Sequence, residues 1–395
     1  MTKENKPEIR FSGFSDAWKQ RKLGDILKLL KDGTHGSHKD VTNGHYLLSA
    51  KNIKDGRIFW DKTDRIISDE DYKKIHSTFK INKGDVLLTI VGSIGETAIF
   101  NVSEEITFQR SVAILRPIDE VSSDFLYSEI TSPKFQKFLN LNKSTSAQPG
   151  IYLGDLANIS FSFPENKEEQ KMIGRLFTGL NSTITLQLRK LELLKNQKKA
   201  FLEKMFPKEG ENVPEIRFSG FSDAWEQRKL DELANRYDNL RIPVAESERI
   251  HGDIPYYGAN GIQDYVEGFT HDGEYILVAE DGANDLKNYP VHYVNGKVWV
   301  NNHAHVLQAK DCCNTKFLKY VFQTTDLTPF LVGGGRAKLN ADVMMQLVLN
   351  VPSNIEEQNK IAEFIFKIED LITLQLRKLE ILKNIKKSFL QKMFV

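Results

Sequence analysis

Residues Ile184–Phe206 read ITLQLRKLELLKNQKKAFLEKMF, and residues Ile372–Phe394 read ITLQLRKLEILKNIKKSFLQKMF. The two stretches are identical at 19 of 23 positions. Within and before them, apolar residues recur every three or four positions, which places them on one face of an α-helix. Upstream, Asn166 with Glu169 and Ser353 with Glu356 have the spacing of a helix cap followed by an acid. The sequence therefore predicts two long helices.

The apolar stripe of each helix continues for about five heptads, which is long enough to form a seam with another helix. Two such helices in one chain would most simply pair with each other. The alternative is that each helix packs separately on its own domain. The residues expected to pair the helices or to dock other subunits are Ile173, Phe177, Leu180, Ile184, Leu188, Leu191, Ile361, Ile365, Ile368, Ile372, Leu376 and Leu379.

A second repeat opens each half of the chain. The segment PEIRFSGFSDAW at residues 7–18 returns unchanged at residues 214–225, and 16 of the 17 positions that begin at Pro7 are identical. This repeat is offset by 207 residues and the helical one by 188, so the bodies between them differ in length. The pattern predicts a first domain at 7–163, a helix at 164–206, a linker at 207–213, a second domain at 214–351 and a second helix at 352–395.

The two divergent bodies show the same mixture of strands and helices. Runs rich in apolar and β-branched residues predict strands at 85–90 and 112–115 in the first body, and at 275–278 and 298–300 in the second. Segments 125–130 and 317–322 have helical character, and both bodies end on a loop of small residues followed by a strand. We therefore expect an α+β protein with an internal pseudo-twofold repeat, built from two similar mixed α/β domains, each followed by a long helix.

Composition excludes several classes of protein. A hydrophobic content of 40% in 395 residues argues against disorder, and no apolar run approaches the ~20 residues that cross a bilayer. The only cysteines, Cys312 and Cys313, are adjacent, which favours a reducing cytoplasm over a disulfide-bonded protein. The net charge of +1, taken as a single number, argues against nucleic-acid binding. The charge is unevenly distributed along the chain, however. The first body has 17 basic and 18 acidic residues, the second body has 10 basic and 16 acidic residues, and the repeated regions have 27 basic and 19 acidic residues.

The sequence contains none of the common catalytic motifs. It has no phosphate-binding loop, no dinucleotide fingerprint and no aminomethyltransferase motif. The pairs His35/His38 and His303/His305 lack a second ligand pair at zinc spacing, so structural or surface roles are favoured. The acidic run Asp69–Asp71 is expected to be a solvated loop. We therefore expect no catalytic, cofactor-binding or metal site in this chain.

The order of these features resembles the specificity subunit of type I restriction-modification systems. The resemblance is carried by Pro164 with Glu169-Gln170, by Pro352 with Glu357-Gln358, by the paired helical repeats and by the strand starts at Gly84 and Gly273. It covers essentially the whole chain. It implies that each body is a target-recognition domain that reads one half of a split double-stranded DNA sequence. It also implies that the helices pair as an antiparallel coiled coil that acts as a spacer.

The resemblance further implies a hetero-oligomer of this non-catalytic chain with two methyltransferase subunits and two restriction subunits. The helices would dock these partners, which would bring S-adenosylmethionine, ATP and Mg²⁺. Because phosphate neutralisation dominates DNA affinity, two bodies without excess positive charge should bind DNA weakly alone. Partner subunits would then complete a positive channel around the duplex. The basic residues of the helices are expected to face either DNA, acidic partner surfaces or solvent.

Base reading is expected from loops that combine amide, hydroxyl and guanidinium groups with nearby glycines, since Arg suits guanine and Asn or Gln suits adenine. The candidates are Ser93, Gln109, Arg110, Ser144, Thr145, Ser146, Gln148, Asn284, Lys287, Asn288, Asn302, His303, Arg336 and Lys338. Arg336, after three glycines, is the strongest. Two other functions remain open: a helical adaptor that does not read DNA, and a stand-alone DNA-modifying enzyme with an unrecognised site.

Overall fold

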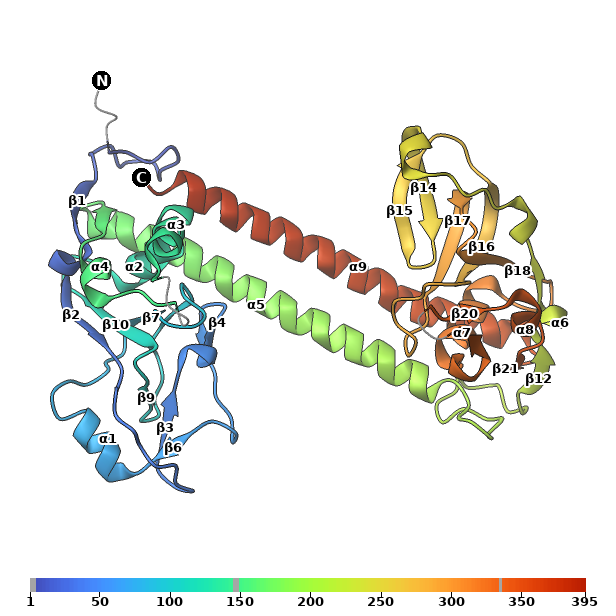
Figure 1. The fold of residues 1–395 in the computed structure, drawn as a ribbon, viewed down its shortest axis with the longest axis horizontal. Helices are drawn as coiled ribbons and strands as arrows, with labels where there is room; N and C mark the ends of the chain where they lie inside the picture. Colours follow the sequence, from blue (N-terminus) through green and yellow to red (C-terminus); the bar gives the residue numbers. More distant parts are fainter. Residues whose placement is uncertain (1–4, 145–148, 334–335) are drawn as a thin grey trace. The chain divides into compact units, whose positions relative to one another are not determined.

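The computed structural model describes residues 5–144, 149–333 and 336–395. The chain divides into two compact units (Figure 1). Unit 1 comprises Met1–Arg189 and Arg377–Val395, and unit 2 comprises Lys190–Leu376. Each unit therefore contains one divergent body, the first part of the long helix that follows it, and the last part of the other long helix. In the described part of the chain, no helix is both long and apolar enough to span a membrane.

Unit 1 is built around the antiparallel sheet β2-β10-β7-β8, beside which a smaller sheet has the order β6-β3-β9. Strands β1 and β11 pair separately, as do β4 and β5. The strands are β1 Lys19–Lys22, β2 Leu27–Asp32, β3 His45–Leu48, β4 Ile53–Lys54, β5 Arg57–Ile58, β6 Ile66–Ile67, β7 Val86–Thr89, β8 Thr97–Ile99, β9 Thr107–Phe108, β10 Val112–Pro117 and β11 Ser160–Phe163. The helices are α1 Asp69–Ile75, α2 Ser123–Ile130, α3 Pro133–Asn142, α4 Leu153–Ala157 and α5 Lys167–Lys204, which continues into unit 2.

Unit 2 is built around a six-stranded sheet of order β13-β18-β16-β17-β14-β15. Strands β12 and β21 pair separately, as do β19 and β20. The strands are β12 Glu226–Lys229, β13 Ala234–Arg236, β14 His251–Gly258, β15 Gly261–Val266, β16 His271–Ala279, β17 Val291–Val300, β18 Ala304–Ala309, β19 Leu331–Val332, β20 Lys338–Leu339 and β21 Val348–Val351. The helices are α6 Leu230–Leu233, α7 Thr315–Thr324, α8 Ala341–Met345 and α9 Ile355–Lys392, which ends in unit 1.

The two bodies share one core. The order β2-β10-β7-β8 in unit 1 corresponds to β13-β18-β16-β17 in unit 2, with α2 and α7 at equivalent places in the chain. The central strands carry apolar residues on both of their faces, because both faces are covered. In β7, Val86 and Leu88 join the core that contains α2, whereas Leu87 joins a second core on the opposite face. In β16, Ile276 and Tyr275 divide in the same way. The predicted α+β class and the likeness of the two bodies are confirmed.

Both predicted long helices are present, and the predicted capping residue is correct for the first helix but wrong for the second. Asn166 caps α5 by accepting a hydrogen bond from the amide of Glu168 at 2.9 Å, and Asn354, in place of the predicted Ser353, caps α9 through the amide of Glu356 at 2.8 Å. The expectation of a solvated loop at Asp69–Asp71 is wrong, because these acids form the first turn of α1. Ser68 caps that helix, and acids stabilise a helix N-terminus by opposing its dipole.

The repeated opening segment ties each body to the end of the other body's helix. In unit 1 the amide of Ile9 donates to the carbonyl of Lys392, the last residue of α9, at 3.0 Å. In unit 2 the amide of Ile216 donates to the carbonyl of Lys204, the last residue of α5, at 2.8 Å. A helix end leaves carbonyls without partners, so these bonds satisfy groups that the helices cannot satisfy themselves. This role explains why the opening segment and the helix ends repeat together.

The helices pair antiparallel within each unit. In unit 1 the ring of Phe177, early in α5, lies 5.5 Å from that of Phe394, just after α9. In unit 2 the ring of Phe201, late in α5, lies 4.8 Å from that of Phe364, early in α9. The two helices therefore pair with each other, and each also packs on the body that precedes it in the sequence. Ile173 and Ile361, at the starts of the helices, are buried in the cores of those bodies.

The predicted helix seam is buried at most of its positions but not at all of them. Phe177, Leu191, Ile365, Ile368 and Leu379 are buried, while Leu180, Ile184 and Ile372 are half-buried. Leu188 and Leu376 are 37% and 46% exposed, so they do not belong to a buried seam. A seven-residue stripe drifts around a helix of 3.6 residues per turn, and here the polar Thr185 and Gln375 take the buried places.

Candidate nucleic-acid interface

In the second body, several predicted reading residues meet at one end of the large sheet. Strand β16 ends before Asp281 and Gly282, and β18 begins directly after His303. The hairpin of β19 and β20 carries Arg336 to the same place, since the amide of Gly282 donates to the carbonyl of Ala337 at 3.3 Å. Gly282 has a φ of +71°, and a Cβ added there would lie 3.4 Å from Arg336 Nε. This glycine therefore permits the guanidinium to lie close to the strand end.

Arg336 is held by an acid that sequence reasoning did not select. Arg336 Nη2 lies 2.9 Å from Asp281 Oδ1, and His303 Nδ1 lies 2.6 Å from the same oxygen. Burial raises the pKa of Asp281, but the hydrogen bond from His303 and the Arg336 guanidinium outweigh it, and the pKa falls below its usual value. The Arg336 side chain remains 61% exposed. Asp281 thus orients a cation that still presents donors to solvent.

A buried polar network supports this end of the sheet. His305 is completely buried, and its Nδ1 lies 2.7 Å from Asp238 Oδ2. Asp238, Glu280 and His305 are close enough together to hold a metal ion. Arg241 supplies a positive charge among them, because its Nη1 donates to Glu280 at 2.7 Å and its Nη2 lies 3.5 Å from Asp238. Lys338, another predicted residue, pairs with Glu280 at 3.1 Å.

The remaining predicted residues of this body lie in neighbouring loops. The amide of Asn284 donates to Asn260 Oδ1 at 2.9 Å, and Asn260 in turn donates to the carbonyl of Gly282, so Asn284 belongs to the same edge. Lys287 is exposed. Asn288 Nδ2 donates to Asp285 Oδ2 at 2.9 Å, so part of its amide serves its own loop. Asn302 is exposed, and its carbonyl lies 3.4 Å from Arg241.

In the first body the predicted residues lie at the equivalent edge. Ser93 follows the end of β7, as Asp281 follows β16, and Gln109 and Arg110 precede β10, as Asn302 and His303 precede β18. Ser93 and Gln109 line a hollow of about 650 Å³. Gln109 and Arg110 line a neighbouring hollow of about 290 Å³. The structure therefore brings these three predicted residues to two adjacent hollows.

Ser144 lies beside the same edge. Its hydroxyl accepts a hydrogen bond from the amide of Gly150 at 3.0 Å, and Gly150 bridges to Val91 next to the end of β7. The corresponding bridge in the second body joins Asp281 to Lys338. Thr145, Ser146 and Gln148 lie outside the described residues.

Sequence reasoning missed several polar residues of these hollows. Lys51 and Lys54 line the hollow that contains Ser93, and His35 and Arg65 line the one that contains Arg110. They lie far from Ser93 and Arg110 in the sequence, and of the four only His35 has glycines close by on both sides, at Gly33 and Gly36. The parallel pairing of β3 with β9, which joins Leu48 to Phe108, brings the segment after β3 to Gln109. The parallel bridge between Thr34 and Gln109 brings His35 close to Arg110. Lys51, Lys54 and Arg65 offer local positive charges for phosphate contact on a body whose total charge is nearly balanced.

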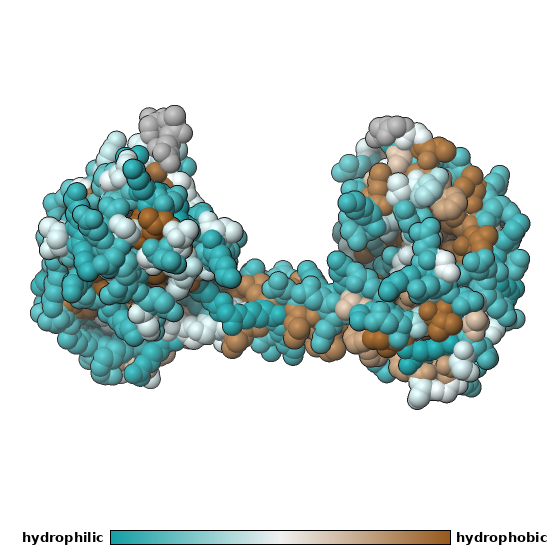
Figure 2. Space-filling model, turned by 90° about the horizontal axis from the view of Figure 1, so that it is seen from below, coloured by the Kyte–Doolittle hydropathy of each residue, from teal (hydrophilic) through white to brown (hydrophobic). Residues whose placement is uncertain are grey.

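The long helices expose apolar side chains at repeated positions. Leu186 in unit 1 and Leu374 in unit 2 occupy the same place in the helical repeat and are 61% and 63% exposed. Leu188 and Leu376, which also correspond, are exposed as well. Figure 2 shows hydrophobic residues among the hydrophilic ones along the helices. Large apolar side chains exposed at equivalent positions of both repeats are candidates for contact with another molecule.

Comparison with known proteins identifies relatives over most of the chain. A family model described as the type I restriction modification DNA specificity domain matches residues 15–196 and 222–387. A type I restriction enzyme specificity subunit of Haemophilus influenzae is 48% identical over 127 residues, which are 32% of this chain and 33% of that protein. The MjaX specificity subunit of Methanocaldococcus jannaschii is 22% identical over 413 residues, which cover 98% of this chain and 95% of that one. The crystal structure of an S subunit from M. genitalium has the same fold, with a TM-score of 0.74 at 15% identity over 99% of both chains.

Proposed function

This chain belongs to the family of type I restriction-modification DNA specificity subunits, and we propose that it recognises a DNA target in two separate parts, one with each body. The observation that carries the proposal is the contrast between the constant and the divergent parts of the two halves. The opening segments and helix ends repeat almost unchanged, whereas the residues at the equivalent sheet edges differ completely. The first body has Ser93, Gln109 and Arg110 at this edge. The second body has Asp281, Asn302 and His303 at the equivalent positions. Such a division suits a common frame that presents two different reading surfaces.

Exchange of one body tests this proposal. Residues 231–351 would be replaced by the corresponding body of another specificity subunit, and the methylated sequence would be determined in DNA from cells that carry the chimaera with its modification partner. We expect one half of the methylated sequence to change and the other half to stay. The matched chimaera at residues 24–163 should change the opposite half. If either chimaera left the methylated sequence unchanged, the chain would be an adaptor that does not read DNA.

Arg336 is the residue of the second body from which we expect the largest effect on DNA binding. Arg336→Ala should weaken binding to a target with the cognate second half-site by ~1–3 kcal/mol, because a bidentate contact to a base is lost. The discrimination against mismatched second half-sites should fall with it. Affinity would be measured with the assembled methyltransferase complex at one fixed salt concentration. Lys54→Ala is the control, since loss of an exposed lysine that is expected to contact phosphate should weaken all sequences alike. Unchanged discrimination in Arg336→Ala would contradict the assignment.

The repeated exposed leucines support docking of two copies of one partner. Leu186 and Leu374 present the same exposed side chain on two pseudo-equivalent surfaces. One kind of partner surface would therefore fit both. We assign these surfaces to two methyltransferase subunits, and two restriction subunits would complete the enzyme. S-adenosylmethionine, ATP and Mg²⁺ would be bound by those partners, which would carry out methyl transfer and cleavage in the cytoplasm, while this chain selects the sequence.

A further inference from the structure

A buried ion cluster joins the two helices to the body in unit 2. Glu369 of α9 accepts from Lys198 of α5 and from Lys319 of α7, both at 2.6 Å. The hydroxyl of Tyr320 donates to the same carboxylate at 2.9 Å. Burial raises the pKa of Glu369, but the two ammonium groups outweigh burial and hold that pKa below its usual value. One carboxylate thus satisfies two lysines and a tyrosine.

The equivalent place in unit 1 lacks that carboxylate. The helical repeat puts Asn181 in the place of Glu369 and Lys386 in the place of Lys198. Asn181 Nδ2 donates to the hydroxyl of Tyr127 at 2.8 Å, so the amide is engaged with α2 instead of the lysine. Among the described residues Lys386 forms no ion pair, although Asp55 and Glu96 act on it electrostatically. Burial lowers the pKa of Lys386, and these two carboxylates only partly oppose the shift.

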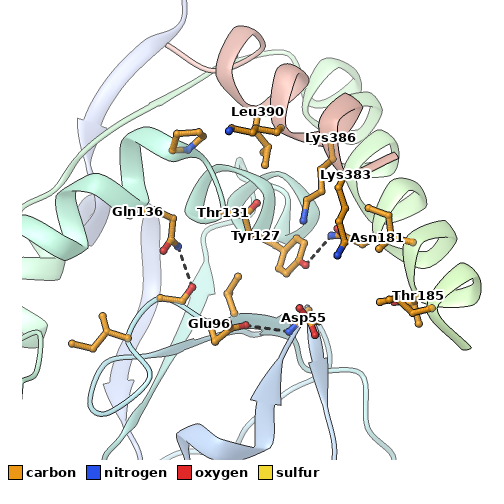
Figure 3. A pocket seen from close by; sticks show the side chains of 18 residues that line it. Asp55, Glu96, Tyr127, Thr131, Gln136, Asn181, Thr185, Lys383, Lys386 and Leu390 are labelled. Carbon is orange, nitrogen blue, oxygen red and sulfur yellow. Dashed lines mark hydrogen bonds between the residues drawn. The ribbon is translucent and has the colours of Figure 1, made fainter. Parts of the chain in front are cut away.

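A cavity of about 650 Å³ occupies this place in unit 1. Figure 3 shows Lys383 and Lys386 extending from α9 on one side, with Asp55 and Glu96 on the opposite side and Tyr127 between them. Lys387 completes the basic side. The volume lies in the range of ~300–1,000 Å³ that is typical of small-molecule sites. The amide of Asp55 donates to Glu96 Oε2 at 3.1 Å, which fixes the acidic side.

We propose that this cavity binds a small organic phosphate, with its phosphate group on Lys383, Lys386 and Lys387 and its hydroxyl groups directed at Asp55 and Glu96. The phosphate would supply the negative charge that Glu369 supplies in unit 2. Lysine ammonium groups bind phosphates as point charges, and carboxylates accept hydrogen bonds from hydroxyls. Because Tyr127 accepts a hydrogen bond from Asn181, its own hydrogen is free to be donated to the ligand. Apolar residues such as Ile94 and Leu390 line the remainder and suit a carbon skeleton.

Calorimetric titration of the full chain with ribose 5-phosphate tests the proposal. We expect saturable binding that also raises the thermal stability of unit 1, because a ligand bound only to the folded state stabilises it. Lys386→Met should weaken the binding by roughly 10- to 100-fold, which is the effect of losing a charge-assisted hydrogen bond. Asn181→Glu should weaken it similarly by placing a carboxylate beside Lys386, and this variant keeps every lysine.

The matched control is Lys198→Met, which changes the equivalent lysine of unit 2 and should leave the titration unchanged. Absence of saturable binding at millimolar ribose 5-phosphate would overturn the proposal, as would equal binding by Lys386→Met. If inorganic phosphate bound as tightly as ribose 5-phosphate, the organic part would make no contact and the proposed ligand class would be wrong. If duplex DNA alone gave an affinity that depends on Lys386, the site would be a DNA backbone contact instead.

Discussion

Replacement of Phe394 by alanine should unfold the first body, although this residue lies at the opposite end of the sequence. Phe394 is 7% exposed, and its ring lies 5.7 Å from that of Phe125 and 6.2 Å from that of Trp18. Removing a buried phenylalanine costs about 3–5 kcal/mol of folding free energy, because both burial and packing are lost. Hydrogen exchange should therefore accelerate in the amides of β7 and β10 of unit 1. The amides of β16 and β18 in unit 2 should keep their protection.

The mirror variant Phe206→Ala is the control for this prediction. Phe206 is 5% exposed, and its ring lies 5.7 Å from both Trp225 and Phe317, the counterparts of Trp18 and Phe125. This variant should lose protection in β16 and β18 and keep it in β7 and β10. If both variants destabilised the body that precedes the mutated helix in sequence, the exchange of helix ends between the bodies would be refuted.

Loss of the Glu357 carboxylate should have a comparable effect on unit 2. Arg217 Nε and Nη2 donate to the two oxygens of Glu357 at 2.6 and 2.8 Å, and the Glu357 side chain is 1% exposed. Breaking a buried ion pair from one side costs about 3–5 kcal/mol, since the other charge stays buried without a partner. Glu357→Gln should therefore lower the free energy of unfolding of unit 2 by this amount. The measurement is a urea titration in which hydrogen exchange of the unit 2 amides reports unfolding.

Two further variants separate this effect from general loss of charge. Glu215→Gln removes an exposed pair with Lys204, formed at 2.7 Å, and should leave the free energy of unfolding nearly unchanged. The double variant Arg217→Met with Glu357→Met should be more stable than Glu357→Gln, because no buried charge is left alone. Equal stability of Glu357→Gln and Glu215→Gln would show that the buried pair contributes no more to the free energy of unfolding than the exposed pair does, which would contradict the prediction. The same geometry recurs at Arg10 and Glu169 in unit 1, where the distances are 2.6 and 2.8 Å.

Local signals in the sequence predicted both long helices and some of the strands. Helical spacing predicted α5 and α9, and apolar runs predicted β7, β10, β16 and the end of β17. The errors occurred where two local explanations competed. Ser353 and Asn354 are both good capping residues, and only the position of the first helical turn selects Asn354. The acids Asp69–Asp71 would be solvated either in a loop or in the first turn of a helix. The capping hydrogen bond of Ser68 shows that they form the first turn of a helix.

The positions of the candidate residues at strand ends could be predicted from the sequence, but their interactions could not. Glycines and small polar residues at strand ends marked Ser93, Gln109, His303 and Arg336, and all of them lie at equivalent sheet edges. Nothing in the spacing indicated that Asp281 holds Arg336, because the two residues are far apart in sequence and meet only through the bridge between Asp281 and Lys338. Lys51 and Arg65 were missed for the same reason, since strand pairing alone brings them to the hollows.

The sequence by itself determined that the chain is a duplicated unit with constant helices and divergent bodies, because identity between two distant stretches is visible without coordinates. Only the tertiary structure decided that each body is completed by the end of the other body's helix, with Phe394 in the first core and Phe206 in the second. The physical reason is that the two repeats are nearly identical, so an apolar helix end matches both cores in composition and pattern. Which core it enters depends on the antiparallel pairing of the helices, and that is a long-range contact that no local signal encodes.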